Sequence, residues 1–204
     1  MAGRIEIRKS KKLWVIIAAL CVIAAGVVVL LLSGDKGPLG TPVLTVETPQ
    51  KCSAGEEITL DVTISDMGEA LYPAASMSIS FDPACLEFLG VEEGNVFILD
   101  DKSSSGRQLP DWSCNVEKSN EAGLINVMYL DMTGGRYAFS RELLAEEDNV
   151  VLRLRFRVRG SVRTGDVLDL IVEDAVFAAS EEKESLAMTR NTLRVKNSRI
   201  VIGE

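Results

Sequence analysis

The sequence predicts an all-β domain, a sandwich of two packed sheets, that follows a single apolar helix. Short runs of alternating apolar and polar side chains recur from about residue 42 onward, and this period of two marks strands with one buried face. Turn-forming residues separate the runs. Only residues 140–147 (SRELLAEE) resemble a short helix in this part of the chain. Many short strands with turns between them are typical of a β-sandwich.

The clearest strand lies at 75–81, where three serines alternate with three apolar side chains: Ser76, Met77, Ser78, Ile79, Ser80 and Phe81. Asp82 and Pro83 end it, because proline has no amide hydrogen to donate to a neighbouring strand. A second short strand is predicted from Leu86 to Val91.

The other strands are predicted from similar alternation between turn residues. In chain order they cover 43–47, 57–65, 112–118, 124–132, 150–158, 167–177, 193–195 and 199–202. Residues 119–123 (SNEAG) are expected to form a hairpin turn between two of these strands. Long loops are expected at 95–110 and 132–141.

The N-terminal part of the chain has the features of a membrane anchor. Residues 13–32 carry no charge, and a helix of twenty residues spans roughly 30 Å, the thickness of a bilayer core. Residues 1–12 are basic and are expected to stay in the cytoplasm. We therefore expect a tail at 1–12, a transmembrane helix at 13–32, a Gly/Pro linker at 33–41 and an extracellular domain at 42–204. A cleaved signal peptide is the alternative, but its apolar core is usually only about 7–15 residues long.

Charge and composition exclude several functions. The chain has a net charge of −8, and an acidic surface does not suit nucleic-acid binding, which depends on Lys and Arg at phosphates. It contains no histidine, which removes Ser-His-Asp catalysis and His-based metal sites. The carboxylates show no catalytic spacing and no calcium-loop motif. We expect a protein that is not an enzyme and holds no metal or cofactor.

The four cysteines are widely spaced and form no C-x-x-C motif: Cys21, Cys52, Cys85 and Cys114. Wide spacing gives no support to a zinc or redox site. Two arrangements remain open for the three cysteines of the predicted domain. They could form one disulfide and leave one free thiol, or all three could be buried thiols.

Two surface patterns each allow two interpretations. One face of a predicted strand carries four arginines, Arg153, Arg155, Arg157 and Arg159. They could form a basic stripe that binds an anionic ligand, or they could pair with acids on a neighbouring strand, such as Glu57 and Asp61. The second interpretation is favoured, because cross-strand pairs of opposite charge are common.

The strand at 124–132 has apolar side chains on both faces. Ile125, Val127 and Tyr129 suit the core, which leaves Asn126, Met128 and Leu130 pointing outward. An exposed apolar patch often marks a partner site. The alternative is that the loop at 133–148 covers these side chains, and the residues alone do not decide between the two.

Five motifs in order give the domain a family resemblance. They are Ala54–Leu60 (AGEEITL), Phe81–Glu87 (FDPACLE), Gly123–Gly134 (GLINVMYLDMTG), Val151–Val158 (VLRLRFRV) and Asp174–Phe177 (DAVF). They follow one another in this order through a domain of about 160 residues and resemble the cohesin modules of bacterial cellulosome scaffolds.

The resemblance implies a nine-stranded jelly-roll sandwich that binds a dockerin, a small helical domain that holds calcium and belongs to another protein. It also implies a flat sheet face as the binding site, which carries Ala74, Ser76, Ser78, Asn115, Glu117, Ser119, Met128, Leu130, Asp131 and Gly134. The function predicted is a membrane-anchored, cell-surface cohesin. A carbohydrate-binding sandwich and a structural surface protein are the alternatives; exposed coplanar aromatic side chains would favour the former.

Overall fold

The computed structural model describes residues 40–49, 51–96, 112–132, 134–135, 137–145, 148–180 and 187–203. The predicted tail at 1–12, the apolar helix at 13–32 and nearly all of the linker at 33–41 lie outside this part, as does most of the loop at 95–110. Within the described ranges no helix is both long and apolar enough to span a bilayer.

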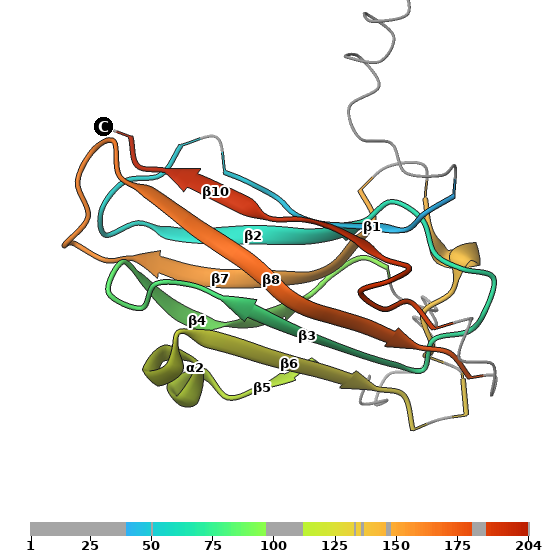
Figure 1. Ribbon diagram of the computed structural model, residues 1–204. Coiled ribbons are helices and arrows are strands. Elements are labelled where there is room, and N and C mark those ends of the chain that lie inside the picture. Colours follow the sequence, from blue (N-terminus) through green and yellow to red (C-terminus); the bar gives the residue numbers. More distant parts are fainter. Residues whose placement is uncertain are drawn as a thin grey trace, which may run out of the picture. The chain divides into compact units, whose positions relative to one another are not determined.

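The domain is a sandwich of two five-stranded sheets (Figure 1). The first sheet has the order β4 (Leu86–Glu93), β7 (Val150–Val158), β2 (Glu57–Ile64), β1 (Val43–Val46) and β9 (Arg194–Lys196). The second has the order β10 (Ser198–Val201), β8 (Val167–Ala178), β3 (Ala74–Ser80), β6 (Leu124–Leu130) and β5 (Ser113–Cys114). Neighbouring strands are antiparallel except β1 and β9, which are parallel.

The predicted two-sheet architecture is confirmed, but the described residues form ten strands rather than nine. The C-terminal stretch makes two strands because it changes sheets: β9 pairs with β1 in the first sheet and β10 pairs with β8 in the second. Asn197 stands at the crossing, where its side-chain oxygen accepts a hydrogen bond from the Val172 amide.

The predicted strand at 124–132 is confirmed as β6, but the rest of the predicted hairpin is wrong. Of the strand predicted at 112–118 only Ser113–Cys114 are strand, and helix α2 (Val116–Ala122) takes the place of the turn predicted at 119–123. The Asn115 side chain accepts a hydrogen bond from the Lys118 amide and so caps the start of α2. Gly123 ends the helix in the left-handed conformation. Asn before and Gly after a short polar segment are helix signals, and here they outweigh the hairpin interpretation.

Alternation along β3 and β6 sorts their side chains between the core and the surface, as the sequence predicts. Ala75, Met77 and Ile79 of β3 are buried, and so are the three predicted core residues of β6. The predicted helix at 140–147 is reduced to one 3₁₀ turn, η1 (Arg141–Leu143), capped by the Ser140 side chain.

Aromatic side chains from both sheets meet in the core. The Phe156 ring of β7 packs against the Phe81 ring, which follows β3 in the second sheet, and against the Phe88 ring of β4, with 5.5 Å between ring centroids in each pair. A second cluster joins Trp112, Tyr129, Phe139, Phe177 and Tyr72. Every aromatic side chain in the described ranges is buried.

The arginine stripe of β7 pairs with acids on the two strands beside it. Arg153 contacts Asp61 on β2 at 3.1 Å, and Arg155 contacts Glu92 on β4 at 3.3 Å. Glu57 is shared by Arg155 and Arg157. The hydrogen bond from Arg157 holds the pKa of Glu57 below its usual range, so the contribution of this pair to stability is lost as the pH falls through that lowered pKa. Cross-strand pairing, not an anion site, therefore accounts for these three arginines.

The three cysteines of the domain are free thiols. Cys52 is buried, and desolvation raises the pKa of its thiol. The Cys85 thiol donates a hydrogen bond to Asp82 at 3.3 Å.

Replacing Gly123 by alanine is expected to destabilise the domain by about 2–3 kcal/mol. The backbone of Gly123 has φ +64°, which L-residues avoid, and an added Cβ would lie 2.8 Å from the Phe81 carbonyl oxygen. Urea unfolding measures the change. Gly160→Ala is the matched control, because a Cβ at Gly160 meets nothing within 4 Å, and we expect a change within about 0.5 kcal/mol. Equal effects of the two substitutions would contradict this account.

Candidate functional site

The outer surface of the second sheet is the candidate site. Along β8, β3, β6 and β5 every second side chain points away from the first sheet, and the pairing of the strands places these side chains in rows. From one end of the sheet inward, the rows are Ala178–Ala74–Leu130, Val176–Ser76–Met128–Ser113, Asp174–Ser78–Asn126 and Ile171–Ser80–Leu124. We call this surface the docking face.

One end of the docking face is apolar. The exposed fraction is 55% for Met128 and 49% for Leu130. Two further side chains extend this end beyond the sheet, Met132 with 81% exposed and Leu71 with 47%. The Leu71 carbonyl accepts a hydrogen bond from the Ser180 amide just after β8, so Leu71 lies next to the Ala178 row.

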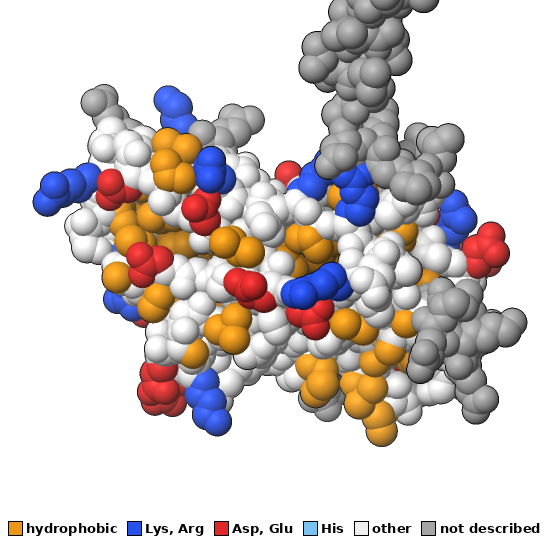
Figure 2. All heavy atoms as spheres, in the orientation of Figure 1, with side chains coloured by type: hydrophobic (Ala, Val, Ile, Leu, Met, Phe, Trp, Pro, Cys, Tyr) orange, Lys and Arg blue, Asp and Glu red, His pale blue; other side chains and the backbone are white. Residues whose placement is uncertain are grey.

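Figure 2 shows the hydrophobic side chains of this end gathered over the end of β6. We call Leu71, Met128, Leu130 and Met132 the apolar end. About half of Met128 and of Leu130 reaches solvent, so the described residues of the loop at 133–148 do not cover them, contrary to that alternative.

The middle of the docking face is polar. The Ser78 hydroxyl donates to the Asn126 side-chain oxygen at 2.7 Å, and the Ser80 hydroxyl donates to Glu173 at 2.7 Å. A bulge in β8 places both Glu173 and Asp174 against this part of β3. Ser113 donates to the Met128 carbonyl at 3.1 Å, whereas the Ser76 hydroxyl has no partner among the described residues.

Five of the ten residues predicted for partner binding lie together on the docking face: Ala74, Ser76, Ser78, Met128 and Leu130. Gly134 is exposed just beyond β6. Asn115 and Glu117 were expected on a hairpin strand, but Asn115 caps α2 and Glu117 is exposed in its first turn.

Ser119 and Asp131 point inward instead. Ser119 is 3% exposed within α2, and Asp131 is 7% exposed. The hairpin interpretation misplaced Ser119, because it assigned to a hairpin turn a residue that faces inward on helix α2. Neither side chain is part of the surface described above.

Asp131 supports the loop beside the apolar end. Its carboxylate accepts hydrogen bonds from the Gly135 amide at 2.9 Å and the Tyr137 amide at 3.2 Å. The Tyr129 hydroxyl donates to the Tyr137 carbonyl, and burial raises the pKa of Tyr129 well above its usual value. Asp131 thereby fixes the chain that follows Met132.

Replacing Asp131 by alanine is expected to cost about 2–3 kcal/mol of unfolding free energy, because it leaves two amides without their acceptor and one of them is buried. Amide hydrogen exchange at Gly135 and Tyr137 should accelerate. Asp131→Asn keeps one side-chain oxygen and should cost less. Unchanged exchange in the alanine variant would show that the carboxylate does not hold this loop.

Sequence reasoning missed the contribution of β8. Ile171, Val176 and Ala178 complete the rows of the docking face, as does Ser113 on β5. The alternation within 167–178 was visible in the sequence, but only strand pairing shows that β8 lies beside β3. Leu71 and Met132 belong to loops, where no period indicates which way a side chain points.

The docking face is shallow and carries both apolar side chains and hydroxyl groups. A shallow hollow on the face is lined by Ser76, Ser78, Ser113, Cys114, Asn126 and Met128. In the ranges that the structure covers, no group of three or more Cys, Asp or Glu residues is placed to hold a metal ion.

Fold and face together define a two-sheet β-sandwich module with a flat, partly apolar sheet surface. The family model described as "Cohesin domain" matches residues 42–195. This chain therefore belongs to the cohesin family.

Solved structures show the same fold. The third cohesin of ScaC from Acetivibrio cellulolyticus, in complex with the ScaB dockerin, is 14% identical, with a TM-score of 0.60 over 80% of this chain and 99% of that one. The OlpC cohesin from Clostridium thermocellum, also in complex with a dockerin, is 16% identical, with a TM-score of 0.58 over 83% and 97%.

The seventh ScaB type I cohesin from Pseudobacteroides cellulosolvens is 16% identical, with a TM-score of 0.54 over 79% and 92%. No curated protein sequence matches this chain.

Proposed function

We propose that this protein is a non-catalytic cohesin module that binds the dockerin domain of another protein through the docking face. The observation that carries the proposal is the exposed apolar end beside the Ser76 hydroxyl, which has no partner among the described residues. The ScaC and OlpC structures are complexes with dockerins, and this chain shares their family and fold.

The docking face suits a helical partner. A sheet surface without deep clefts can receive helices side-on, and burying Met128 and Leu130 under them removes apolar area from water. Ser76 and Ser113 lie in the same row as Met128, so hydroxyl groups able to accept or donate hydrogen bonds flank the apolar contact. Apolar contact would supply most of the affinity, and the hydroxyls would orient the partner.

We also propose that residues 13–32 anchor the module in the cell membrane with a single span, and that the module lies outside the cell. Twenty residues without a charge after a basic tail support this orientation. Protease treatment of intact cells should digest the module and spare the tail. Digestion of the tail alone would indicate the opposite orientation, with the module inside the cell.

The carbohydrate-binding alternative finds no support on this surface. Sugar platforms use exposed aromatic rings, and Trp112, Tyr72, Tyr129 and Tyr137 are all buried.

Calorimetric titration of the full-length chain with each dockerin encoded in the same genome tests the proposal. At least one dockerin should bind in the presence of calcium, and a chelator should abolish binding because the dockerin needs its calcium to fold. Polysaccharide added in place of the dockerin should give no heat of binding. Failure of every calcium-loaded dockerin to bind would overturn the proposed function.

A further inference from the structure

The docking face is polarised along its strands. At one end lie the side chains of the apolar end, and in the middle lie the carboxylates of Glu173 and Asp174. Figure 2 shows the same contrast, with hydrophobic side chains over the end of β6 and charged side chains over the middle of β8. A partner that buries both regions must match each of them.

Asp174 is an acid without a counterion in the part of the chain that the structure describes. It lies in the same row as Ser78 and Asn126, whose side chains form a hydrogen bond with each other. Among the described residues nothing donates a hydrogen bond to Asp174 or pairs with its charge. The other acids of β8 differ, because Glu173 accepts from Ser80 and Asp169 pairs with Arg199 at 3.0 Å.

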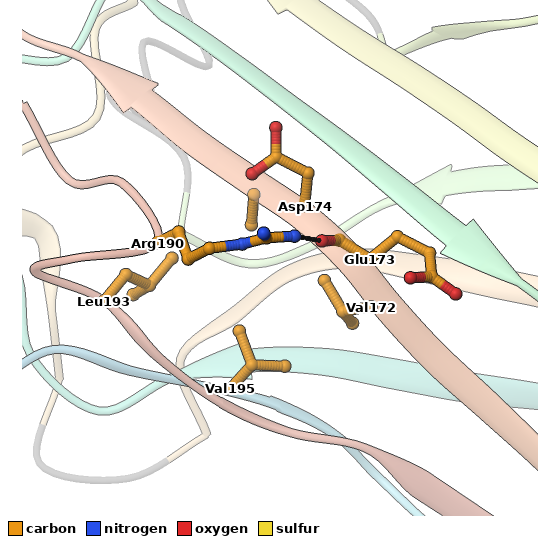
Figure 3. A pocket seen from close by; sticks show the side chains of 7 residues that line it. Val172, Glu173, Asp174, Arg190, Leu193 and Val195 are labelled. Carbon is orange, nitrogen blue, oxygen red and sulfur yellow. Dashed lines mark hydrogen bonds between the residues drawn. The ribbon is translucent and has the colours of Figure 1, made fainter.

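Arg190 lies close by but is engaged elsewhere. Together with Asp174 it lines a recess at the edge of β8, where its guanidinium donates to the Glu173 main-chain carbonyl at 2.6 Å. Figure 3 shows Arg190 reaching that main-chain oxygen, while the side chains of Glu173 and Asp174 leave the strand in different directions. Among the described residues no cation neutralises Asp174, so its carboxylate is open to a group brought by a partner.

A partner that covered Asp174 without supplying a cation would desolvate an unpaired charge, which is costly. A basic residue on the partner would form a charge-assisted hydrogen bond with the carboxylate and so offset the cost of desolvation. Charge complementarity thus favours Lys or Arg at this point of the partner's surface, on the same side of the partner as its contacts with Met128 and Leu130.

The spacing of the rows sets the spacing on the partner. Side chains two residues apart on a strand are about 6.7 Å apart, and neighbouring strands are about 4.8 Å apart. Asp174 lies one row from Met128 along the strands and two strands away from it across the sheet, a separation of about 12 Å. A helix rises about 12 Å over eight residues. The matching helix crosses the docking face obliquely, with an aliphatic residue over Met128 and Lys or Arg about eight positions further on.

We propose that the partner is a dockerin whose docking helix is polarised in this way, with its aliphatic residues on the apolar end and its basic residue on Asp174. This inference rests on the proposed function and adds the chemistry of the partner's helix and the direction in which it lies.

The test compares neutralisation of Asp174 with neutralisation of an acid that is already paired. With a calcium-loaded dockerin that binds the full-length chain, Asp174→Asn should raise Kd about tenfold, and Asp174→Lys about a hundredfold. Asp169→Asn is the matched control, with the same charge change on the same strand, and should change Kd less than twofold.

A charge swap identifies the partner residue. Each Lys or Arg of the dockerin's docking helix is replaced by Glu in turn, and Asp174→Lys should restore binding for one of them, about eight positions from the aliphatic residue that contacts Met128. Tight binding that responds to neither Asp174→Asn nor the swap would overturn this inference and leave the proposed function standing. Absence of binding by every dockerin would overturn both.

Discussion

Replacing Met128 by aspartate is expected to weaken dockerin binding by a hundredfold or more while the domain stays folded. Met128 is half exposed in the row of Val176, Ser76 and Ser113, in the apolar end of the docking face. An apolar side chain that the partner buries completely can contribute about 2 kcal/mol or more to binding. A carboxylate in that position would be buried by the partner's helix without a counterion, which adds to the loss.

Two measurements separate lost binding from lost folding. Urea unfolding of Met128→Asp should differ from wild type by no more than about 1 kcal/mol, because the side chain is exposed in the free protein. Thr59→Asp places the same charge on an exposed position of β2 in the other sheet and should leave Kd unchanged. A folded Met128→Asp variant with the affinity of wild type would exclude the docking face as the binding site.

The largest expected effect on stability comes from Phe156→Ala, which should lower the free energy of unfolding by about 3–5 kcal/mol. Phe156 is fully buried on β7, and its ring contacts Phe88 within its own sheet and Phe81 of the opposite sheet. Removing it opens a cavity between the sheets and deletes two aromatic contacts. Because small domains are stable by only about 5–15 kcal/mol, much of the stability would be lost.

Urea unfolding followed by near-ultraviolet circular dichroism measures this change. Phe156→Leu, which keeps most of the apolar volume, is the control and should cost clearly less than the alanine substitution. A loss below about 1 kcal/mol for Phe156→Ala would show that the two sheets do not depend on this contact.

Periodicity was the reliable guide to individual strands. The serines of 76–80 and the core residues of 125–129 lie on the predicted faces of β3 and β6, because in a strand successive side chains must point to opposite sides. The same rule identified Met128 and Leu130 as outward-facing apolar residues before any partner was considered. The family resemblance then supplied the fold, and the match over residues 42–195 confirms the family.

Prediction of secondary structure from the local sequence failed where strand, turn and helix signals occurred in the same segment. The segment 115–122 was expected to contain the end of a strand and a turn, yet the cap at Asn115 and the left-handed Gly123 make it helix α2. Hydrogen bonds between Asn120 and the backbone of Phe88 fix that helix against β4, and the sequence gives no sign of such a distant contact.

The order of residues alone determined which segments become strands and which side of each is buried, since backbone geometry imposes that alternation wherever a strand forms. Only the tertiary structure decided which strands adjoin. β3 and β4 are neighbours in the chain but lie in different sheets, whereas β3 and β8, about a hundred residues apart, form a ladder. Strand pairing depends on hydrogen bonds and packing across long separations, and the docking face exists only because that pairing brings Met128, Ser76 and Asp174 onto one surface.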